Sequence, residues 1–315
     1  MTSADVFDAH TLRFWQRVWR ILDPKITLAS AASLFLGASG AARAGSIDWG
    51  WLAIAAVGIF LLEAAKNASG ELFDFESGAD AGVAPEDRSP LSGGKRVLVD
   101  GLLTSDQVRT LAVLLYGLGI ASGVVIALWR EPGVLWFGLL GVGLAYSYHA
   151  PPLRLSYRGL GEIAVALGYG PGMACGLYLV QRHQVTTDVL LASLPLGLLI
   201  AGFLWINEFP DFRADRDAGK RTLVVRLGRR AASRAFAGIH AVAYLMIALL
   251  PLLGLPRTVW LGVAGLPFGI AAAARLMADP ERTERIIPAQ RWTLVGFVIA
   301  AAGLGAGLLL AGSGR

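Results

Sequence analysis

The sequence predicts an all-α polytopic membrane protein, with about nine transmembrane helices bundled around a central cavity that opens to the cytoplasmic side. The composition is the first support. Of the 315 residues, 55% are hydrophobic and 16% are charged, whereas soluble domains carry roughly one quarter charged residues. The second support is that the apolar residues gather in long runs. The third is that two runs end in acids, which near a bilayer core are expensive and indicate function.

The apolar runs give nine candidate spans when compared with the length needed to cross roughly 30 Å of hydrocarbon. A short charged segment, Trp129 to Pro132, divides the third run from the fourth. The chain also contains 39 glycines, which suit close contacts between membrane helices. The predicted spans are 26–45, 50–70, 108–128, 132–148, 160–181, 189–209, 233–254, 258–277 and 292–311.

Residues 1–25 precede the first span and are predicted to lie in the membrane interface. Phe14, Trp15 and Trp19 alternate there with arginines, as expected for an amphipathic interfacial helix. We expect a simple anchor rather than a catalytic segment. Residues 26–315 are predicted to form a single transmembrane domain.

Most of the 28 Lys and Arg residues fall on one side of the predicted bundle. Cytoplasmic loops of membrane proteins carry such an excess of positive charge. We therefore expect an integral protein of the bacterial cytoplasmic membrane, with the N-terminus and both acidic motifs cytoplasmic and the C-terminus outside. The net charge of +5 then needs no nucleic acid, because basic residues meet anionic lipid or an anionic substrate.

Two predicted helices each end in acids with an asparagine one turn upstream. Residues three, four or seven positions apart share one face of a helix, so each motif forms an oxygen-rich stripe. Two such stripes facing each other would bind hard divalent cations such as Mg²⁺. The first stripe is Asn67, Glu71 and Asp74, and the second is Asn207, Asp211 and Asp215.

Basic residues follow both acidic motifs in the loops. Arg88 follows the first motif, and Lys220 and Arg221 follow the second. A diphosphate needs both kinds of group, since carboxylates hold Mg²⁺, and Arg or Lys neutralises the remaining phosphate charge. The chain has no P-loop motif. The pattern therefore indicates a Mg²⁺-dependent enzyme that ionises an allylic diphosphate.

These motifs resemble those of the UbiA superfamily of intramembrane prenyltransferases, which carry Asn-Asp-x-x-Asp and Asp-x-x-x-Asp motifs on the second and sixth of about nine helices. The stretch from Asn207 to Gly228 is similar to the branch that prenylates 1,4-dihydroxy-2-naphthoate for menaquinone, and so are the segments from Tyr157 to Pro171 and from Tyr178 to Gln181. The first motif departs from the family, because it has Gly70-Glu71 in place of the usual Asn-Asp. Asn67 could partly substitute for the missing amide.

The resemblance implies transfer of a prenyl group from a polyprenyl diphosphate to an aromatic acceptor. Mg²⁺, the expected cofactor, would be held by Asn67, Glu71, Asp74, Asp211 and Asp215, the four acids being catalytic. Asn207, Arg88, Lys220 and Arg221 would assist in binding the diphosphate. Residues expected near the acceptor or the allylic cation are Tyr146, Tyr148, His149, Arg154, Phe73 and Trp205, and further candidates for metal binding or proton removal are Asp80, Glu162 and Asp217.

Alternatives remain open at this point. The acceptor could be 4-hydroxybenzoate or another precursor, and a carrier or a non-catalytic isoprenoid-binding protein could also place carboxylates between helices. A CDP-alcohol phosphotransferase would need Asp-x-x-Asp-Gly-x-x-Ala-Arg, which this chain lacks. Chain length of the donor and oligomeric state are not specified by the residues.

Overall fold

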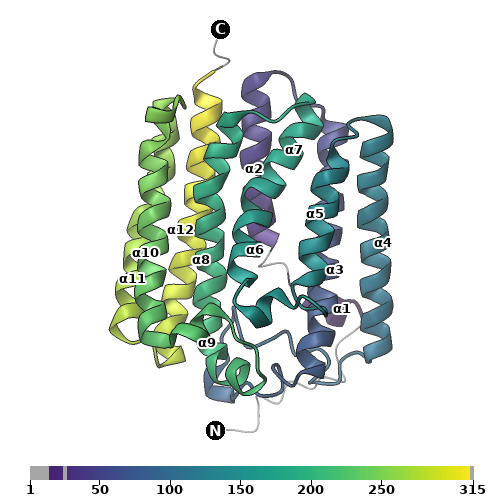
Figure 1. The fold of residues 1–315 in the computed structure, drawn as a ribbon, viewed down its shortest axis with the longest axis vertical. Coiled ribbons are helices and arrows are strands. Elements are labelled where there is room, and N and C mark those ends of the chain that lie inside the picture. The colour runs from purple at the N-terminus through teal and green to yellow at the C-terminus, as the bar shows by residue number, and fades with distance from the viewer. Residues whose placement is uncertain (1–13, 24–26, 313–315) are drawn as a thin grey trace.

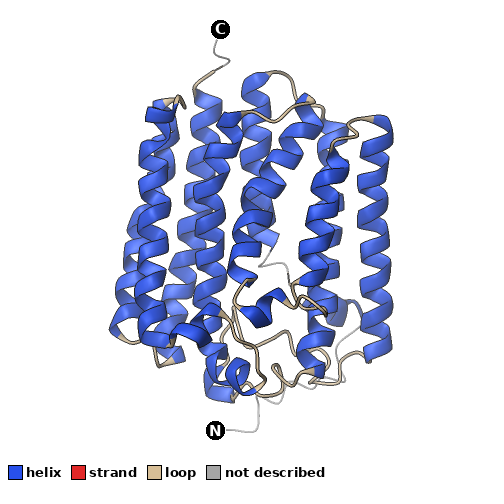
Figure 2. Ribbon diagram, viewed as in Figure 1, coloured by secondary structure: helices blue, strands red, loops and turns tan. Residues whose placement is uncertain are grey.

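The structure is a computed structural model that describes residues 14–23 and 27–312. Within these residues the chain is helical and contains no β-strand, only an isolated bridge between Ser89 and Ser92 (Figure 2). The predicted all-α class is therefore confirmed. The helices are α1 (Phe14–Leu22), α2 (Thr27–Ala44), α3 (Trp49–Glu76), α4 (Ser105–Trp129), α5 (Val134–Ser147), α6 (Gly161–Leu167), α7 (Met173–Arg182), α8 (Thr187–Asp217), α9 (Leu223–Leu227), α10 (Arg229–Leu249), α11 (Leu266–Ala278) and α12 (Thr283–Leu310).

The number of spans differs from the prediction. In the described part, seven helical segments are long and apolar enough to cross a membrane, or eight if α1 and α2, which meet at 59°, count as one bent span. Each of the nine predicted ranges overlaps a helix, but α5 has 14 residues and at 1.5 Å per residue reaches only about 21 Å. The prediction of nine spans is therefore not confirmed. The seven are Trp49–Glu76, Ser105–Trp129, Gly161–Arg182, Thr187–Asp217, Arg229–Leu253, Arg257–Ala278 and Thr283–Leu310.

The long helices run side by side and divide the molecule into two ends (Figure 1). One end carries α1, α9 and the loop that follows α3, whereas the C-terminal end of α12 lies at the opposite end (Figure 1). The acidic ends of α3 and α8 both lie at the end with α1. The two motifs therefore share one membrane face, as the sequence predicts; which face is cytoplasmic stays a prediction.

Glycines allow the helices to approach closely. A Cβ on Gly58 of α3 would lie 2.9 Å from Ser122 of α4. A Cβ on Gly170 would lie 2.8 Å from the Cα of Gly197 in α8. Side chains at these positions would force the backbones apart, which fits the role of small residues in membrane helix packing.

The span that contains α6 and α7 is interrupted by a π-helical turn, Gly168–Gly172, with Pro171 inside it. Proline lacks an N–H and breaks the regular hydrogen-bond ladder, and such π turns often occur at functional sites. Tyr169 belongs to this turn and its side chain is buried. Its hydroxyl donates to Glu63 Oε1 of α3 (3.1 Å), so the break aims a polar side chain into the bundle.

Helix α1 closes the end of the bundle that carries the acidic motifs. Ile21 is fully buried in a small apolar cluster with the loop residues Val97 and Leu102. Arg20 forms an ion pair with Asp100 (2.8 Å), and Trp19 remains 62% exposed. The helix thus has an apolar inner face and an exposed Trp19. Residues 1–13 of the predicted interfacial segment lie outside the described residues.

Candidate active site

The end of α8 lines one polar cavity of about 720 Å³ with Asn207, Asp211 and Asp215, and α3 lines it with Lys66 and Asn67. Asp74 of α3 does not line the cavity itself but contacts Lys220, which does. Helix α1, the loop around Lys95, the segment that follows α5 and the loop that follows α8 contribute further parts of its wall. Residues from segments that are far apart in the sequence meet here, so the cavity exists only in the folded bundle. The polar and charged residues that line it include Gln16, Arg20, Asp23, Lys66, Asn67, Lys95, Tyr148, His149, Asn207, Glu208, Asp211, Asp215, Lys220 and Thr222.

The motif on α8 presents its side chains to this cavity. Asp211 Oδ1 is buried and has no hydrogen-bond partner among the described residues. Asn207 Oδ1 accepts a hydrogen bond from Gln290 Nε2 of α12 (3.0 Å), which orients the amide. A buried carboxylate oxygen without a donor is costly, so Asp211 is a strong candidate to receive a ligand.

Lys220 joins the two acidic helices. Its ammonium lies 3.3 Å from Asp74 Oδ2 and 3.6 Å from Asp215 Oδ1. Burial alone would lower the pKa of Lys220, but the carboxylates of Asp215 and Asp74 outweigh burial and raise this pKa well above its ordinary value. Lys220 is therefore a permanent positive charge between the motifs.

Asp74 is enclosed by three side chains. Tyr157 donates its hydroxyl to Asp74 Oδ1 (3.0 Å), Lys220 contacts Oδ2, and His149 Nε2 lies 3.6 Å from Oδ2. Burial lowers the pKa of His149 to about 3. The carboxylate of Asp74 opposes this decrease, and the ammonium of Lys220 strengthens it. His149 is therefore a neutral ring at pH 7, and it contacts Asp74 as a dipole rather than as a cation.

The unusual Gly70 is explained by this histidine. A Cβ at position 70 would lie 2.6 Å from His149 Cε1. The imidazole therefore fills the space that a larger residue would use. The departure from the family pattern at position 70 is matched by the position of His149.

Glu71 and Asn67 make structural contacts. Glu71 Oε1 accepts a hydrogen bond from the backbone N–H of Leu98 (2.9 Å), and the side chain is buried behind the cavity wall. Asn67 lines the cavity and donates its amide to the Leu22 carbonyl at the end of α1 (3.0 Å). In this arrangement Glu71 holds the loop and Asn67 holds α1.

Several predicted site residues lie away from the cavity. Arg88, Arg154 and Arg221 are exposed and do not line it, and Arg154 stacks over the ring of Tyr157 (5.3 Å). Tyr146 is 50% exposed and contacts Phe73 edge to face. Trp205 donates to the Ala232 carbonyl inside the apolar core and does not line the cavity, so its contacts are those of a packing residue.

The further acidic candidates fall into different environments. Asp80 is buried, and burial together with Asp74 and Glu71 raises its pKa to about 7. Glu162 accepts a hydrogen bond from the Leu223 N–H (2.7 Å) and so anchors α9. Asp217 is exposed and pairs with Arg216 (3.0 Å).

Three basic residues that line the cavity were not predicted as site residues. They are Arg20, Lys66 and Lys95. Arg20 belongs to the predicted anchor, and Lys95 belongs to the loop in which Arg88 was preferred. Lys66 carried a signal in the sequence, because a lysine within a predicted span is by default a functional candidate.

The donor atoms of this site fit Mg²⁺ in kind. Mg²⁺ prefers carboxylate and phosphate oxygens in octahedral geometry, and Asp211 offers a buried carboxylate oxygen without a partner. Across residues 14–23 and 27–312 no group of three acids, histidines or cysteines converges as a preformed metal cage. Lys220 explains this, since its ammonium lies between Asp74 and Asp215. A metal here would rely on phosphate oxygens for part of its coordination.

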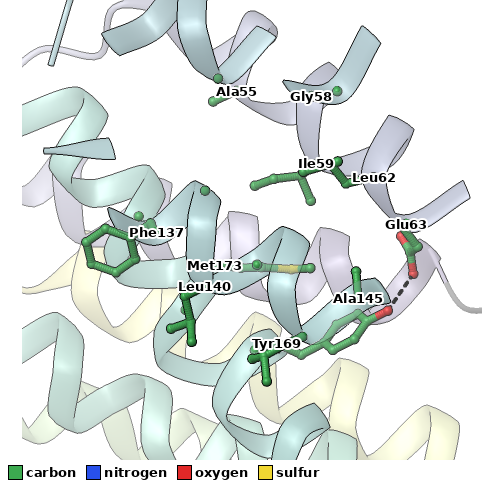
Figure 3. A pocket seen from close by; sticks show the side chains of 18 of the residues that line it. Ala55, Gly58, Ile59, Leu62, Glu63, Phe137, Leu140, Ala145, Tyr169 and Met173 are labelled. Atoms are coloured by element: carbon green, nitrogen blue, oxygen red, sulfur yellow. Dashed lines mark hydrogen bonds between the residues drawn. The ribbon is translucent and has the colours of Figure 1, made fainter. Parts of the chain in front are cut away.

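An apolar pocket of about 180 Å³ adjoins the polar cavity. Figure 3 shows Ile59, Leu62, Phe137 and Met173 around it, with Glu63 and Tyr169 at one side. The pocket and the cavity share four residues, Lys66, Tyr148, Val165 and Tyr169. A polar head and an apolar chain of one ligand could therefore bind on the two sides of this shared wall.

Comparison with known proteins identifies the family. The UbiA prenyltransferase family matches residues 31–295. The chain is 25% identical to a 1,4-dihydroxy-2-naphthoate octaprenyltransferase of Bacillus subtilis (strain 168), over 90% of this chain and 91% of that protein. It is 29% identical to a 2-carboxy-1,4-naphthoquinone phytyltransferase of Synechocystis, over 62% of this chain and 61% of that protein.

Solved structures share the fold. A UbiA homolog from Archaeoglobus fulgidus bound to GPP and Mg²⁺ superposes with a TM-score of 0.62 at 16% identity, covering 91% of this chain and 99% of that chain. The sequence match spans most of the bundle and includes both acidic motifs. The chain thus belongs to the UbiA prenyltransferase family and is a prenyl-transferring membrane enzyme.

Proposed function

We propose that this enzyme transfers a polyprenyl group from its diphosphate to 1,4-dihydroxy-2-naphthoate, as in menaquinone biosynthesis. The observation that carries the proposal is the meeting of both acidic helices and Lys220 in one cavity beside an apolar pocket. The relatives named for naphthoate or naphthoquinone acceptors support the choice of acceptor.

The diphosphate would bind in the polar cavity. Asp74, Asp211 and Asp215 would hold Mg²⁺, with Asn67 and Asn207 beside them, and Mg²⁺ would neutralise charge on the leaving diphosphate. Lys220 and Lys95 would donate to the remaining phosphate oxygens. Glu71, bonded to Leu98, would keep the loop that carries Lys95 in place.

The prenyl chain would extend from the shared wall into the apolar pocket. As the C1–O bond breaks, positive charge would develop at C1, and the ring of Tyr148, which lines both the cavity and the pocket, would stabilise that charge. Diphosphate leaves with the electron pair of the C1–O bond, and a ring carbon of the acceptor bonds to C1. The ring would regain its aromaticity by losing the substituent of that carbon, a proton to water or the carboxylate as CO₂. His149 and Tyr148 line the cavity on this side and would contact the acceptor.

The test is diphosphate release by the purified protein in detergent, with Mg²⁺ and a polyprenyl diphosphate. The naphthoate and 4-hydroxybenzoate are supplied in separate reactions. We expect release that requires both Mg²⁺ and the naphthoate. Release that requires 4-hydroxybenzoate instead would assign another acceptor, and donor binding without release under any condition would make the protein a non-catalytic isoprenoid binder.

A further inference from the structure

A chain of polar contacts crosses the apolar wall between α2, α3 and the π turn. Glu63 is buried and accepts hydrogen bonds from the Ser30 hydroxyl (2.6 Å) and the Tyr169 hydroxyl (3.1 Å). Lys66, one helical turn further along α3, donates to the same Tyr169 hydroxyl (3.1 Å). The contact between Glu63 and Tyr169 is visible in Figure 3. Two opposite charges are thus linked through one tyrosine.

Lys66 stands where the two cavities meet. It lines both the polar cavity and the apolar pocket, and its side chain is half-buried. Its ammonium lies 5.8 Å from the ring centre of Tyr148 and 5.4 Å from that of Tyr169. The ammonium therefore lies beside two aromatic rings, and the carboxylates that act on it are those of Glu63 and Asp23 rather than the acids of the two motifs.

An ammonium group within a membrane span costs free energy, so such a lysine by default indicates a functional site. Lys66 makes one hydrogen bond among the described residues, and an ammonium has three N–H donors. Two donors therefore remain for a ligand that enters from the cavity. The position also matters for catalysis, because a positive charge beside the shared wall would oppose an allylic cation there, and Glu63 reaches this ammonium only through the Tyr169 hydroxyl.

We propose that Lys66 binds the carboxylate of the aromatic acceptor and so makes the enzyme selective for acidic acceptors. This inference rests on the proposed prenyl transfer. A bound carboxylate would neutralise Lys66 next to the developing cation. The rings of Tyr148 and Tyr169 would contact the acceptor ring by stacking or edge to face. Glu63, Ser30 and Tyr169 act as positioning residues that hold the ammonium toward the cavity.

The donor diphosphate is the competing ligand for this charge. Lys220 and Lys95 already lie beside the acidic motifs, whereas Lys66 has the apolar pocket on its other side. An aromatic acid matches such a site, since it joins an anionic group to an apolar ring. A Lys66 variant that loses affinity for the donor alone would assign this charge to the diphosphate and overturn the proposal.

The test is calorimetric binding of two matched probes to the purified protein, 1-hydroxy-2-naphthoate and 1-naphthol, which differ in the carboxylate. We expect the wild type to bind the naphthoate about 10- to 100-fold more tightly, the range given by a hydrogen bond to a charged group. In Lys66→Met this preference falls to within about 3-fold. Lys66→Arg keeps most of it.

Binding of geranylgeranyl diphosphate with Mg²⁺ is measured on the same samples. Unchanged donor binding in Lys66→Met, together with the lost preference, supports the proposal. Equal weakening of both aromatic probes, or weakening of the donor alone, overturns it. If the wild type has no preference for the naphthoate but binds the donor and releases diphosphate, the inference is wrong and the proposed function stands.

Tyr169→Phe provides a second test if Lys66→Met does not fold. This variant keeps the ring and removes the hydroxyl that orients Lys66. We expect a partial loss of the preference for the naphthoate with unchanged binding of 1-naphthol. A full wild-type preference in Tyr169→Phe would overturn the positioning role of this tyrosine.

Discussion

The acidic ends of α3 and α8 have similar spacing in the sequence but different surroundings in the fold. On α8, Asp211 lines the cavity with an unpartnered carboxylate oxygen. On α3, Glu71 is bonded to Leu98 and Asp74 is enclosed by Tyr157, His149 and Lys220. Glu71 Oε2 is also buried without a partner among the described residues, but Glu71 does not line the cavity. The comparison shows that α8 presents its carboxylates to the cavity, whereas α3 uses part of its motif to hold the surrounding structure.

Asp211→Asn should give the largest effect. The change keeps the shape of the side chain and removes the charge that would neutralise bound Mg²⁺ and diphosphate. We expect diphosphate release to fall by about 10²- to 10³-fold, the usual loss for one strong electrostatic contact. The assay is release from a polyprenyl diphosphate in detergent.

Asp217→Asn is the matched control for this variant. It makes the same chemical change on the same helix, but the Asp217 side chain is 68% exposed and pairs with Arg216. We expect release within about 2-fold of the wild type, as for most surface substitutions. Equal loss in both variants would contradict a specific role for Asp211.

Lys220→Met should give the next largest effect, because it breaks the link between the two helices. Asp74 and Asp215 would both lose their cation while 14% and 6% exposed. Removing one partner of a buried pair costs about 3–5 kcal/mol, so we expect the Tm to fall by roughly 5–10 °C. Thermal unfolding followed by circular dichroism measures this.

Arg221→Met is the control for Lys220→Met, because Arg221 is the next residue and is exposed. Its Tm should change by less than about 2 °C. Adding Asp74→Asn to Lys220→Met should recover part of the lost stability, since it removes one uncompensated charge. No recovery would mean that the lysine acts through packing alone.

Gly70→Ala tests the contact between α3 and His149. The new methyl group would overlap the imidazole, and overpacking of this kind costs about 1–3 kcal/mol. We expect a Tm lower by a few degrees, and recovery in the double variant Gly70→Ala with His149→Ala. The control is Gly117→Ala in α4, where a Cβ meets nothing within 4 Å and the Tm should stay the same or rise.

Glu71→Gln should give the smallest effect. Glutamine can still accept the hydrogen bond from the Leu98 N–H, so the rate of diphosphate release should stay within about 3-fold of the wild-type rate and the Tm should stay close to the wild-type value. Glu71→Ala, in contrast, would leave the Leu98 N–H without its acceptor. If Glu71→Gln is as damaging as Asp211→Asn, Glu71 is a metal ligand and the proposed difference between the helices is wrong.

The sequence predicts the parts of this architecture that depend on hydropathy and helical spacing. The all-α class and the shared end of the two motifs follow from the apolar runs and from the positions of Asn67 and Asn207 within them. The count of nine spans is not confirmed at α5, which has 14 residues, and α2 counts as a span only as a bent pair with α1. A run of apolar residues does not reveal where a helix ends. A span count based on apolar runs also depends on where the loops lie, and tertiary contacts decide where the loops lie.

The residues of the candidate site could be predicted where they belong to a helix motif, and less well where they belong to loops. Lys220 lies at the cavity, but its neighbour Arg221 and the loop residue Arg88 are exposed. Nothing in the order of loop residues specifies which side chain turns inward. The sequence indicates Lys66 only as a charged residue within a predicted span. Its hydrogen-bond partner Tyr169 comes from a turn far along the chain and could not be predicted.

The most direct test of a shared site for the prenyl diphosphate is calorimetric binding of geranylgeranyl diphosphate to the wild type and to Asp211→Asn, with Mg²⁺ and with EDTA. If α3 and α8 hold the diphosphate together through Mg²⁺ and Lys220, the wild type binds with Mg²⁺, loses most affinity in EDTA, and Asp211→Asn binds weakly in both. Equal binding by both proteins with and without Mg²⁺ would contradict the account.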